Sequence, residues 1–249
     1  MFVKKIRNLD DPKTTEQYHA LLIRNKPFLK KIYISFYTQF KEKILSSKKG
    51  TIVELGSGGG FIKEIIPNVI TSDVMKLDTV DMHFSALNMP FKDETIDGFV
   101  MIDVMHHVPD VKKLFTEMNR CLKKGSKIIM IEPANTIWSK IIYRYFHHEL
   151  FDPKGQWSFK SIGPLSSSNL ALPWIVFFRD KEIFNQLFPN LTVKKVIPHT
   201  PFLYLLSGGL SFPQIVPSWT YQFIIFFEKL LKHLNPHIGM FYTIEIIKK

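Results

Sequence analysis

The chain has 249 residues, of which 45% are hydrophobic and 22% charged. This length and apolar fraction predict one large α/β domain rather than two independent domains or a disordered chain. The formal charge of +11 is compatible with a solvated lysine-rich surface or with a face for nucleic acid, anionic lipid or a phosphorylated substrate. The single cysteine, Cys121, excludes an internal disulfide framework and a cysteine-rich metal site.

Residues 13–46 predict two helices, the second with an apolar stripe that runs from Phe28 to Ile44 at helical spacing. From residue 50, short apolar runs alternate with turns and helical stretches, which predicts βαβ units and a parallel sheet. The expected strands are Thr51–Leu55, Asn68–Val74, Asp78–Met82, Gly98–Val104, Lys127–Glu132, Thr192–Ile197 and Phe241–Ile247.

Helices are expected at two places between these strands. Asp110 is a good N-cap for an amphipathic helix that Lys123, Lys124 and Gly125 would close. Residues 136–190 lack regular periodicity, apart from a helix expected from about Arg179 to Leu187.

A glycine-rich turn follows the first expected strand. Glu54, Gly56, Gly58 and Gly60 form E-x-G-x-G-x-G, and glycines there let the backbone approach a ligand without a Cβ in the way. A dinucleotide site uses similar glycines, but with the spacing G-x-G-x-x-G and a pyrophosphate to bind. The preceding carboxylate instead favours S-adenosylmethionine, whose sulfonium and amino groups are cationic. Asp73, at the end of the second strand, is expected to bind the ribose hydroxyls, although a turn or N-cap role is the alternative.

The segments VELGSGGG, SDV, SALNMPFKDETIDGFVMIDVMHHVPD and IEPA stand in this order between Ile52 and Pro133. In these segments the chain resembles the class I S-adenosylmethionine-dependent methyltransferases, particularly the broad type 11 group. The resemblance implies a Rossmann-like α/β fold with a seven-stranded, mostly parallel sheet whose last strand is antiparallel. We expect a single domain over 1–249, with an N-terminal helical cap (1–48), a cofactor-binding core (49–135), and C-terminal apolar insertions with the last two strands (136–249).

The resemblance also implies which residues bind S-adenosylmethionine. One residue departs from the family pattern, because Ser85 stands where the family has an acidic residue that holds the adenine. Asp103 and Val104 would lie beside the methionine moiety. The full expected set is Glu54, Leu55, Gly56, Ser57, Gly58, Gly60, Asp73, Val74, Ser85, Ala86, Leu87, Asp103 and Val104.

Two histidine clusters are candidates for the acceptor side. His106 and His107 follow the fourth expected strand, and the sequence HHE places His147, His148 and Glu149 in an aromatic segment. A hydroxyl acceptor needs its proton removed, so we expect His147 or His148 to be the general base, with Glu149 orienting it. The alternative is a pair of surface histidines on a helix. No metal site is expected, since three consecutive residues cannot share one helical face.

The 32 residues from Val196 to Phe227 contain no Asp, Glu, Lys or Arg, and the apolar surface continues to Leu234. Prolines and glycines interrupt the run too often for a clean membrane span. Core packing, a hydrophobic acceptor pocket and docking on an anionic bilayer are the three possible roles. We expect oxygen methylation of a small-molecule, lipid or lipid-linked glycan acceptor by a cytoplasmic protein, peripheral on the inner face of the membrane.

Two other functional classes stay open at this point. The positive charge would suit an RNA or protein methyltransferase, although no recognised RNA-binding module is visible, which argues against a nucleic-acid partner. Ser85 leaves room for a non-catalytic binding protein with a cofactor fold. The sequence does not fix the oligomeric state.

Overall fold

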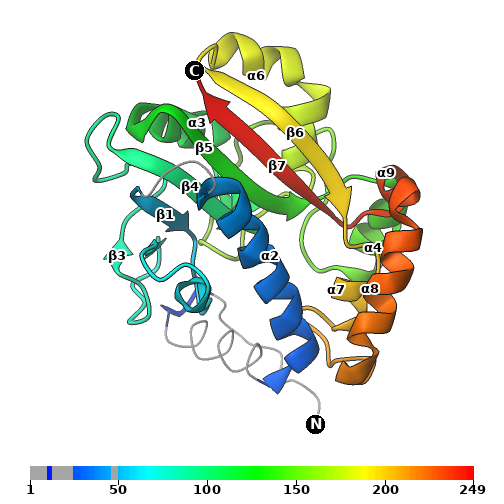
Figure 1. Cartoon of the computed structure of the whole chain (residues 1–249). Coiled ribbons are helices and arrows are strands. Elements are labelled where there is room, and N and C mark those ends of the chain that lie inside the picture. Colours follow the sequence, from blue (N-terminus) through cyan, green and yellow to red (C-terminus); the bar gives the residue numbers. More distant parts are fainter. Residues whose placement is uncertain (1–9, 13–24, 46–49) are drawn as a thin grey trace.

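A computed structural model describes residues 10–12, 25–45 and 50–249 of the chain. Seven strands form one sheet in the order β3-β2-β1-β4-β5-β7-β6 (Figure 1). The strands are β1 (Ile52–Leu55), β2 (Ile70–Asp73), β3 (Met82–His83), β4 (Ile96–Ile102), β5 (Leu122–Pro133), β6 (Leu191–His199) and β7 (Phe241–Lys248). The pairs from β3 through to β5 are parallel, whereas β7 is antiparallel to both β5 and β6. The predicted fold class is confirmed.

The third strand is shorter than expected and begins later. We expected Asp78–Met82, but the strand is Met82–His83, and Asp78 lies in a turn. The carboxylate of Asp81 accepts hydrogen bonds from the backbone N–H and the hydroxyl of Thr71, at 2.9 and 3.0 Å. The backbone N–H of Asp81 also donates to the Thr71 carbonyl at 3.0 Å, so Asp81 joins the chain to β2 just before β3 begins.

Helix α2 (Pro27–Leu45) covers one face of the sheet (Figure 1). The predicted apolar stripe on this helix is buried, with Phe28 and Phe40 fully inaccessible. Successive residues of the central strands alternate between the two faces, as the pleat requires. Ile52 and Val100 pack with the apolar stripe of α2, whereas Val53 belongs to the hydrophobic core on the opposite face of the sheet. The first expected helix falls mainly on residues 13–24, outside the described residues.

The opposite face is covered by α3 (Val111–Cys121) and α6 (Lys181–Leu187). The carboxylate of Asp110 accepts a hydrogen bond from the backbone N–H of Lys113 at 2.9 Å, so the predicted N-cap is present. The expected closure of this helix is wrong. The chain passes directly from Cys121 into β5, where Lys123 and Lys124 lie, and Gly125 takes up a left-handed conformation within that strand with φ of 77°.

The region after β5 is more regular than the sequence indicated. Helix α4 (Ile137–Phe146) begins at a capping box in which Thr136 and Ser139 each accept a hydrogen bond from the other residue's backbone N–H. The remaining elements before β6 are α5 (Leu172–Trp174), a π-helical turn η3 (Ile175–Arg179) and α6. The helix expected from about Arg179 to Leu187 corresponds to α6.

Between β6 and β7 the chain forms short helices. They are α7 (Leu203–Leu206), η4 (Ser218–Thr220), α8 (Tyr221–Leu230), η5 (Lys232–Leu234) and α9 (Asn235–Ile238). Two further 3-10 turns, η1 (Ile62–Glu64) and η2 (Met105–His107), follow β1 and β4. None of the helices in the described parts of the chain is long and apolar enough to cross a membrane.

Replacing Asp110 by Ala removes the side-chain acceptor at the start of α3. We expect the free energy of unfolding to fall by about 1 kcal/mol, as for other lost N-caps. Chemical denaturation measures the change, and Lys112→Ala on the exposed side of the same helix is the control. Equal stability of the two variants would contradict a capping role for Asp110.

Candidate functional site

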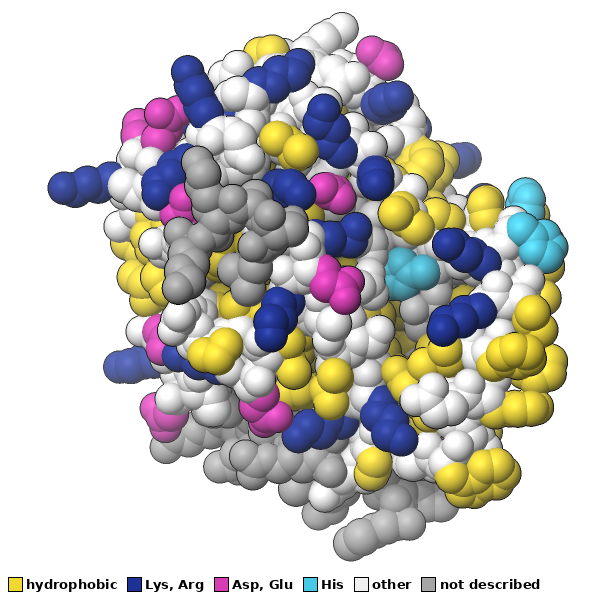
Figure 2. All heavy atoms as spheres, in the orientation of Figure 1, with side chains coloured by type: hydrophobic (Ala, Val, Ile, Leu, Met, Phe, Trp, Pro, Cys, Tyr) yellow, Lys and Arg dark blue, Asp and Glu magenta, His cyan; other side chains and the backbone are white. Residues whose placement is uncertain are grey.

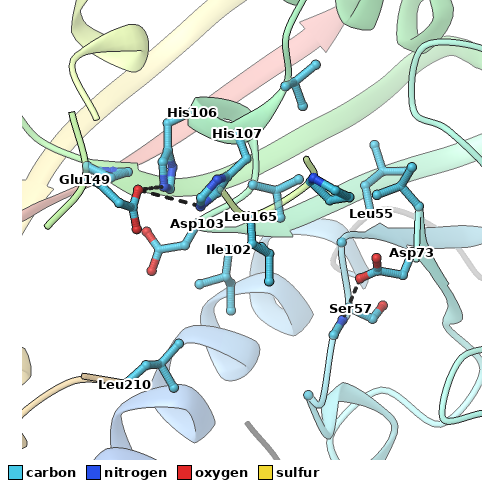
Figure 3. A pocket seen from close by; sticks show the side chains of 18 of the residues that line it. Leu55, Ser57, Asp73, Ile102, Asp103, His106, His107, Glu149, Leu165 and Leu210 are labelled. Atoms are coloured by element: carbon cyan, nitrogen blue, oxygen red, sulfur yellow. Dashed lines mark hydrogen bonds and ion pairs between the residues drawn. The ribbon is translucent and has the colours of Figure 1, made fainter. Parts of the chain in front are cut away.

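A cavity of about 730 Å³ lies at the carboxyl ends of β1, β2 and β4 (Figure 3). The glycine-rich turn after β1, the end of β2 and the segment after β3 form one end. The turn η2, the end of α4 and the segment around Leu165 form the other. Residues from the insertion between β6 and β7, among them Leu205 and Leu210, complete the wall. Ligands of open α/β sheets bind at this edge.

The glycine-rich turn needs its glycines for two different reasons. Gly56 and Gly58 have φ of 67° and 50°, in the left-handed region. A Cβ on Gly60 would lie 2.6 Å from the Tyr37 hydroxyl oxygen and 2.8 Å from the Ser57 carbonyl oxygen. A hydrogen bond also fixes the turn to β2, because the backbone N–H of Gly58 donates to the Asp73 carboxylate at 2.9 Å. The turn is therefore held in place before any ligand binds.

Glu54 supplies an unpaired negative group beneath this turn. Its side chain lines the cavity and is 3% exposed, and its Oε2 atom makes no hydrogen bond within the described part of the chain. Burial raises the pKa of Glu54 to about 7, a hydrogen bond to Ser57 lowers it, and the neighbouring Asp73 carboxylate raises it further. A buried carboxylate without a partner is costly, and a cationic ligand relieves that cost. Glu54 therefore suits the cationic groups of S-adenosylmethionine.

Asp73 combines the two roles that the sequence left open. One oxygen accepts the Gly58 N–H and the other accepts the Met75 N–H, both at 2.9 Å, so Asp73 does form a turn with its own backbone. Each carboxylate oxygen keeps a further lone pair for a ribose hydroxyl. Burial raises its pKa, and the backbone N–H groups lower it. Ribose binding by Asp73 stays a prediction.

The segment expected to hold the adenine also lines the cavity. The Ser85 hydroxyl oxygen accepts the backbone N–H of Leu87 at 3.2 Å, so it closes its own turn. Ala86 and Leu87 present backbone and apolar side chains to the cavity. The remaining expected cofactor residues, namely Leu55, Ser57, Val74, Asp103 and Val104, line it as well.

His106 lies between two carboxylates. Its Nδ1 atom is 2.9 Å from Glu132, whose second oxygen accepts the backbone N–H groups of Val104 and Met105 at 2.9 and 2.8 Å. Its Nε2 atom is 3.3 Å from Glu149 (Figure 3). Burial alone would lower the pKa of His106, but Glu132 and Glu149 outweigh burial and raise it to about 10. His106 is therefore a cation that joins β5 to the segment after α4.

His107 has the opposite character. Its Nδ1 atom is 3.2 Å from the Ser167 carbonyl oxygen and its Nε2 atom is 3.7 Å from Glu149. Burial and the positive charge of His106 lower the pKa of His107 to about 4. The ring is neutral near pH 7, and a carbonyl can only accept, so Nδ1 carries the proton. The Nε2 lone pair is then available at the cavity.

Two carboxylates complete this end of the cavity. Burial raises the pKa of Glu149, but the hydrogen bond to His106 and the charges of the neighbouring histidines outweigh it and hold the pKa well below its usual range. Burial raises the pKa of Asp103 to about 7, against the charge of His106. Asp103 also adopts φ of 55°, an uncommon conformation outside glycine, which points to a constrained position.

The structure regroups the two predicted histidine clusters. Glu149 pairs with His106 and His107, and not mainly with its sequence neighbours. The Nδ1 atom of His147 accepts the Glu149 backbone N–H at 3.2 Å. His148 is 57% exposed and lies 3.9 Å from the Glu149 carboxylate. Both line the cavity, and their role as general base stays a prediction.

Glu132 ends the fifth expected strand and lies next to the cavity's histidines. Its side chain is fully buried beneath His106. Its signal is an acidic residue at the end of a strand that is otherwise apolar, since a buried carboxylate requires partners.

Among the residues that the structure describes, those grouped closely enough to hold a metal ion lie around His106. His106, His107 and Glu149 offer ligand atoms within 4.8 Å of one another, as do Asp103, His106 and Glu132. We expected no metal site because His147, His148 and Glu149 are consecutive in sequence. That reason does not apply to the two groups around His106. His106 bridges Glu132 and Glu149, and two backbone N–H groups also bind Glu132, so the cluster forms an ion-pair and hydrogen-bond network.

Comparison with known proteins gives a consistent result. Residues 53–130 match the family model described as a methyltransferase domain. A demethylmenaquinone methyltransferase from Halalkalibacterium halodurans is 31% identical over 144 residues, which cover 55% of this chain and 54% of that protein. The enzyme of the same name from Staphylococcus haemolyticus is 32% identical over 68 residues, covering 26% of this chain and 28% of that protein. The chain thus spans about half the length of the first relative, and less of the second.

Solved structures share the fold at low sequence identity. A SAM-dependent methyltransferase from Thermotoga maritima has a TM-score of 0.56 and 16% identity, with 97% of this chain and 98% of that chain covered. A chain from the Haloferax volcanii complex of the Trm112 methyltransferase activator with a methyltransferase has a TM-score of 0.53 and 13% identity, with the same coverage. Residues 53–130 thus match a methyltransferase domain, and the whole chain shares the fold of these S-adenosylmethionine-dependent methyltransferases.

The position of Glu54 predicts a pH dependence of cofactor binding. The groups that face it are Asp73 on β2, Ser57 on the turn, and Tyr33 and Tyr37 on α2. Because only the ionised carboxylate attracts a cation, affinity for S-adenosylmethionine should rise as the pH increases through about 7. From a pKa of about 7, we expect roughly tenfold tighter binding at pH 8 than at pH 6.

Isothermal titration calorimetry at the two pH values measures this change. In Glu54→Gln the dependence should be lost, whereas Glu64→Gln, at an exposed glutamate, should keep the wild-type dependence. An unchanged slope in Glu54→Gln would show that another group causes it.

Proposed function

We propose that this protein transfers a methyl group from S-adenosylmethionine to an oxygen of a small, largely apolar acceptor. The observation that carries this proposal is the single cavity that joins the glycine-rich turn to His107 and Glu149. Its described lining includes Glu54, Asp73 and Asp103 but no Lys or Arg. Apart from His106, which already lies between Glu132 and Glu149, the charged side chains of this lining are carboxylates, so a neutral acceptor is favoured over an anionic one.

His107 is the group best placed to activate a hydroxyl. When bound, S-adenosylmethionine supplies a methyl group on a positively charged sulfur, which leaves with the bonding electron pair. The Nε2 lone pair of His107 accepts the proton of the acceptor hydroxyl as the oxygen bonds to the methyl carbon. Glu149, 3.7 Å away, then stabilises the imidazolium ring. The Ser167 carbonyl holds the ring in the tautomer that this step requires.

The apolar walls define the class of acceptor. Leu165, Leu170, Leu205 and Leu210 line the cavity beyond the histidines. The relatives named demethylmenaquinone methyltransferase support an aromatic, quinone-like acceptor, for which such walls are suitable. A lipid or a lipid-linked glycan with a free hydroxyl is compatible with the same walls. We propose that the protein acts in the cytoplasm, peripheral on the inner face of the membrane, where such acceptors are found.

The two other classes gain less support. An RNA acceptor would bring phosphates next to buried carboxylates, and the described lining contains no Lys or Arg to bind them. A non-catalytic binding protein would not need His107 and Glu149 to converge at the cavity. Neither class explains why a neutral histidine has its free nitrogen at the acceptor end.

Transfer of a labelled methyl group tests the proposal directly. The purified protein is incubated with methyl-labelled S-adenosylmethionine and, separately, with reduced demethylmenaquinone, a polyprenol, a biogenic amine, RNA and a protein mixture. We expect label on an oxygen atom of an apolar hydroxyl acceptor. Label on a ring carbon of the quinol, or only in the amine, RNA or protein, would refute oxygen methylation, and cofactor binding without any transfer would favour a binding protein.

Replacing His107 by Ala should lower kcat by about 10² to 10⁴-fold, the usual contribution of a general base. The affinity for S-adenosylmethionine should change little, because Glu54 and the glycine-rich turn are untouched. Glu149→Gln should lower kcat less, since the base remains. Steady-state kinetics and calorimetry separate the two effects, with His233→Ala on the exposed turn η5 as the control. Full activity of His107→Ala would transfer the role of base to another group, with His147 and His148 the next candidates.

A further inference from the structure

A set of large apolar side chains is exposed on and beside α8. Within the chain's described residues, this apolar face consists of Phe212, Ile215, Trp219, Phe223, Phe226, Phe227 and Leu230, which are 44–80% exposed. Figure 2 shows hydrophobic side chains gathered on the side of the molecule where α8 lies in Figure 1. Exposed apolar residues that form a contiguous patch mark an interaction surface.

Helix α8 has a separate inner side that packs on the body of the protein. Tyr221 is buried, its hydroxyl donates to the Lys31 carbonyl at 3.1 Å, and its ring packs edge-on against Phe28 at 5.1 Å. The outward rings contact one another, with centroids 4.7 Å apart for Phe223 and Phe227. The inner side of α8 is therefore packed against the protein, whereas the phenylalanines of its outer side lie outside the core.

The charges around this face have one sign. From residue 183 to the end of the chain, Glu228 and Glu245 are the only acidic side chains. Glu228 accepts the backbone N–H groups at the start of α7, both at 2.8 Å, and Glu245 forms ion pairs with two lysines of the body. Lys229 and Lys232 are exposed beside the phenylalanines. Aromatic side chains flanked by lysines complement an anionic lipid bilayer.

The apolar face adjoins the acceptor end of the cavity. Leu210 and Ser211 line the cavity, and Phe212, the next residue, is 56% exposed. The ammonium group of Lys26, itself 7% exposed, donates to the carbonyls of Gly209 and Phe212 and so holds this loop at its base. One short loop thus has its inner side in the cavity and its outer end at the apolar face.

We propose that the apolar face docks on an anionic lipid bilayer and that the loop around Leu210 and Phe212 admits a lipid-soluble acceptor from that bilayer. The docking stands on the exposed surface alone, and the admission of the acceptor rests on the proposed function. The phenylalanines enter the lipid, and Lys229 and Lys232 lie at the headgroups. A second copy of this chain is the competing occupant.

Co-sedimentation with vesicles measures the docking. We expect the protein to bind vesicles of phosphatidylcholine with phosphatidylglycerol at low salt, and phosphatidylcholine alone much less. The double variant Phe226→Ser/Phe227→Ser should lose at least about tenfold in binding, given the usual value of buried apolar area. Ile162→Ser/Ile183→Ser, at exposed residues away from α8, is the matched control and should bind as the wild type does.

The charge and the orientation have tests of their own. Neutralising Lys229 or Lys232 to Gln should weaken binding about fivefold each, whereas Lys194→Gln and Lys195→Gln on the exposed part of β6 should have less effect. Trp219, 80% exposed, should be quenched by brominated lipid, and this quenching should be lost in Trp219→Phe.

Two outcomes would overturn the docking. One is the absence of binding to anionic vesicles at low salt. The other is a dimer in solution that Phe226→Ser/Phe227→Ser converts to a monomer, because the face would then belong to a second copy. Cofactor affinity and methyl transfer to a detergent-dispersed acceptor are measured on the same variants. If both persist while vesicle binding is absent, only the docking fails. If the protein binds vesicles but methylates no acceptor, the proposed function fails, together with the admission of the acceptor that rests on it, and the docking stands.

Discussion

The carboxylate of Glu132 is the interaction on which both ends of the site depend. It is fully buried at the end of β5 and accepts two backbone N–H groups of the turn after β4, as well as the Nδ1 proton of His106. An ionised group in this position is tolerable only with such partners. By fixing this turn, Glu132 sets the position of Asp103 on the cofactor side and of His107 on the acceptor side. The two halves of the cavity are thus aligned by one buried side chain.

The distribution of negative charge explains how one cavity serves two different ligands. Within the described residues the Oε2 atom of Glu54 has no hydrogen-bond partner, so that end suits a cation, whereas Glu149 is paired with His106. The protonated His106 also keeps its neighbour His107 neutral, because a second positive charge at a ring distance of 4.3 Å is unfavourable. Neighbouring groups in one cavity therefore suit a cationic cofactor at one end and a neutral acceptor at the other.

The sequence predicted the sheet and the glycine-rich turn because their signals are local. Apolar runs, glycine spacing and the N-cap at Asp110 each reflect contacts within a few residues. The acceptor end could not be predicted in the same way. Glu149 reaches His106 across 43 positions of sequence, and the partner of His107 is a backbone carbonyl, which no side-chain pattern reveals. The start of helix α4 was missed because its capping box has Ser139 where Glu or Gln is usual, so it carries no familiar sequence signature.

The insertion between β6 and β7 links the chemistry to the surface. Its residues have three different environments: Tyr221 packs in the core, Leu205 and Leu210 line the cavity, and Phe226 is exposed. Such a division is possible because a short helix has distinct faces and a loop has two sides. Its only acidic residue, Glu228, is used to hold the start of α7, so the outer side carries no exposed acid. One segment of the chain therefore both completes the wall of the cavity and presents the exposed apolar face beside it.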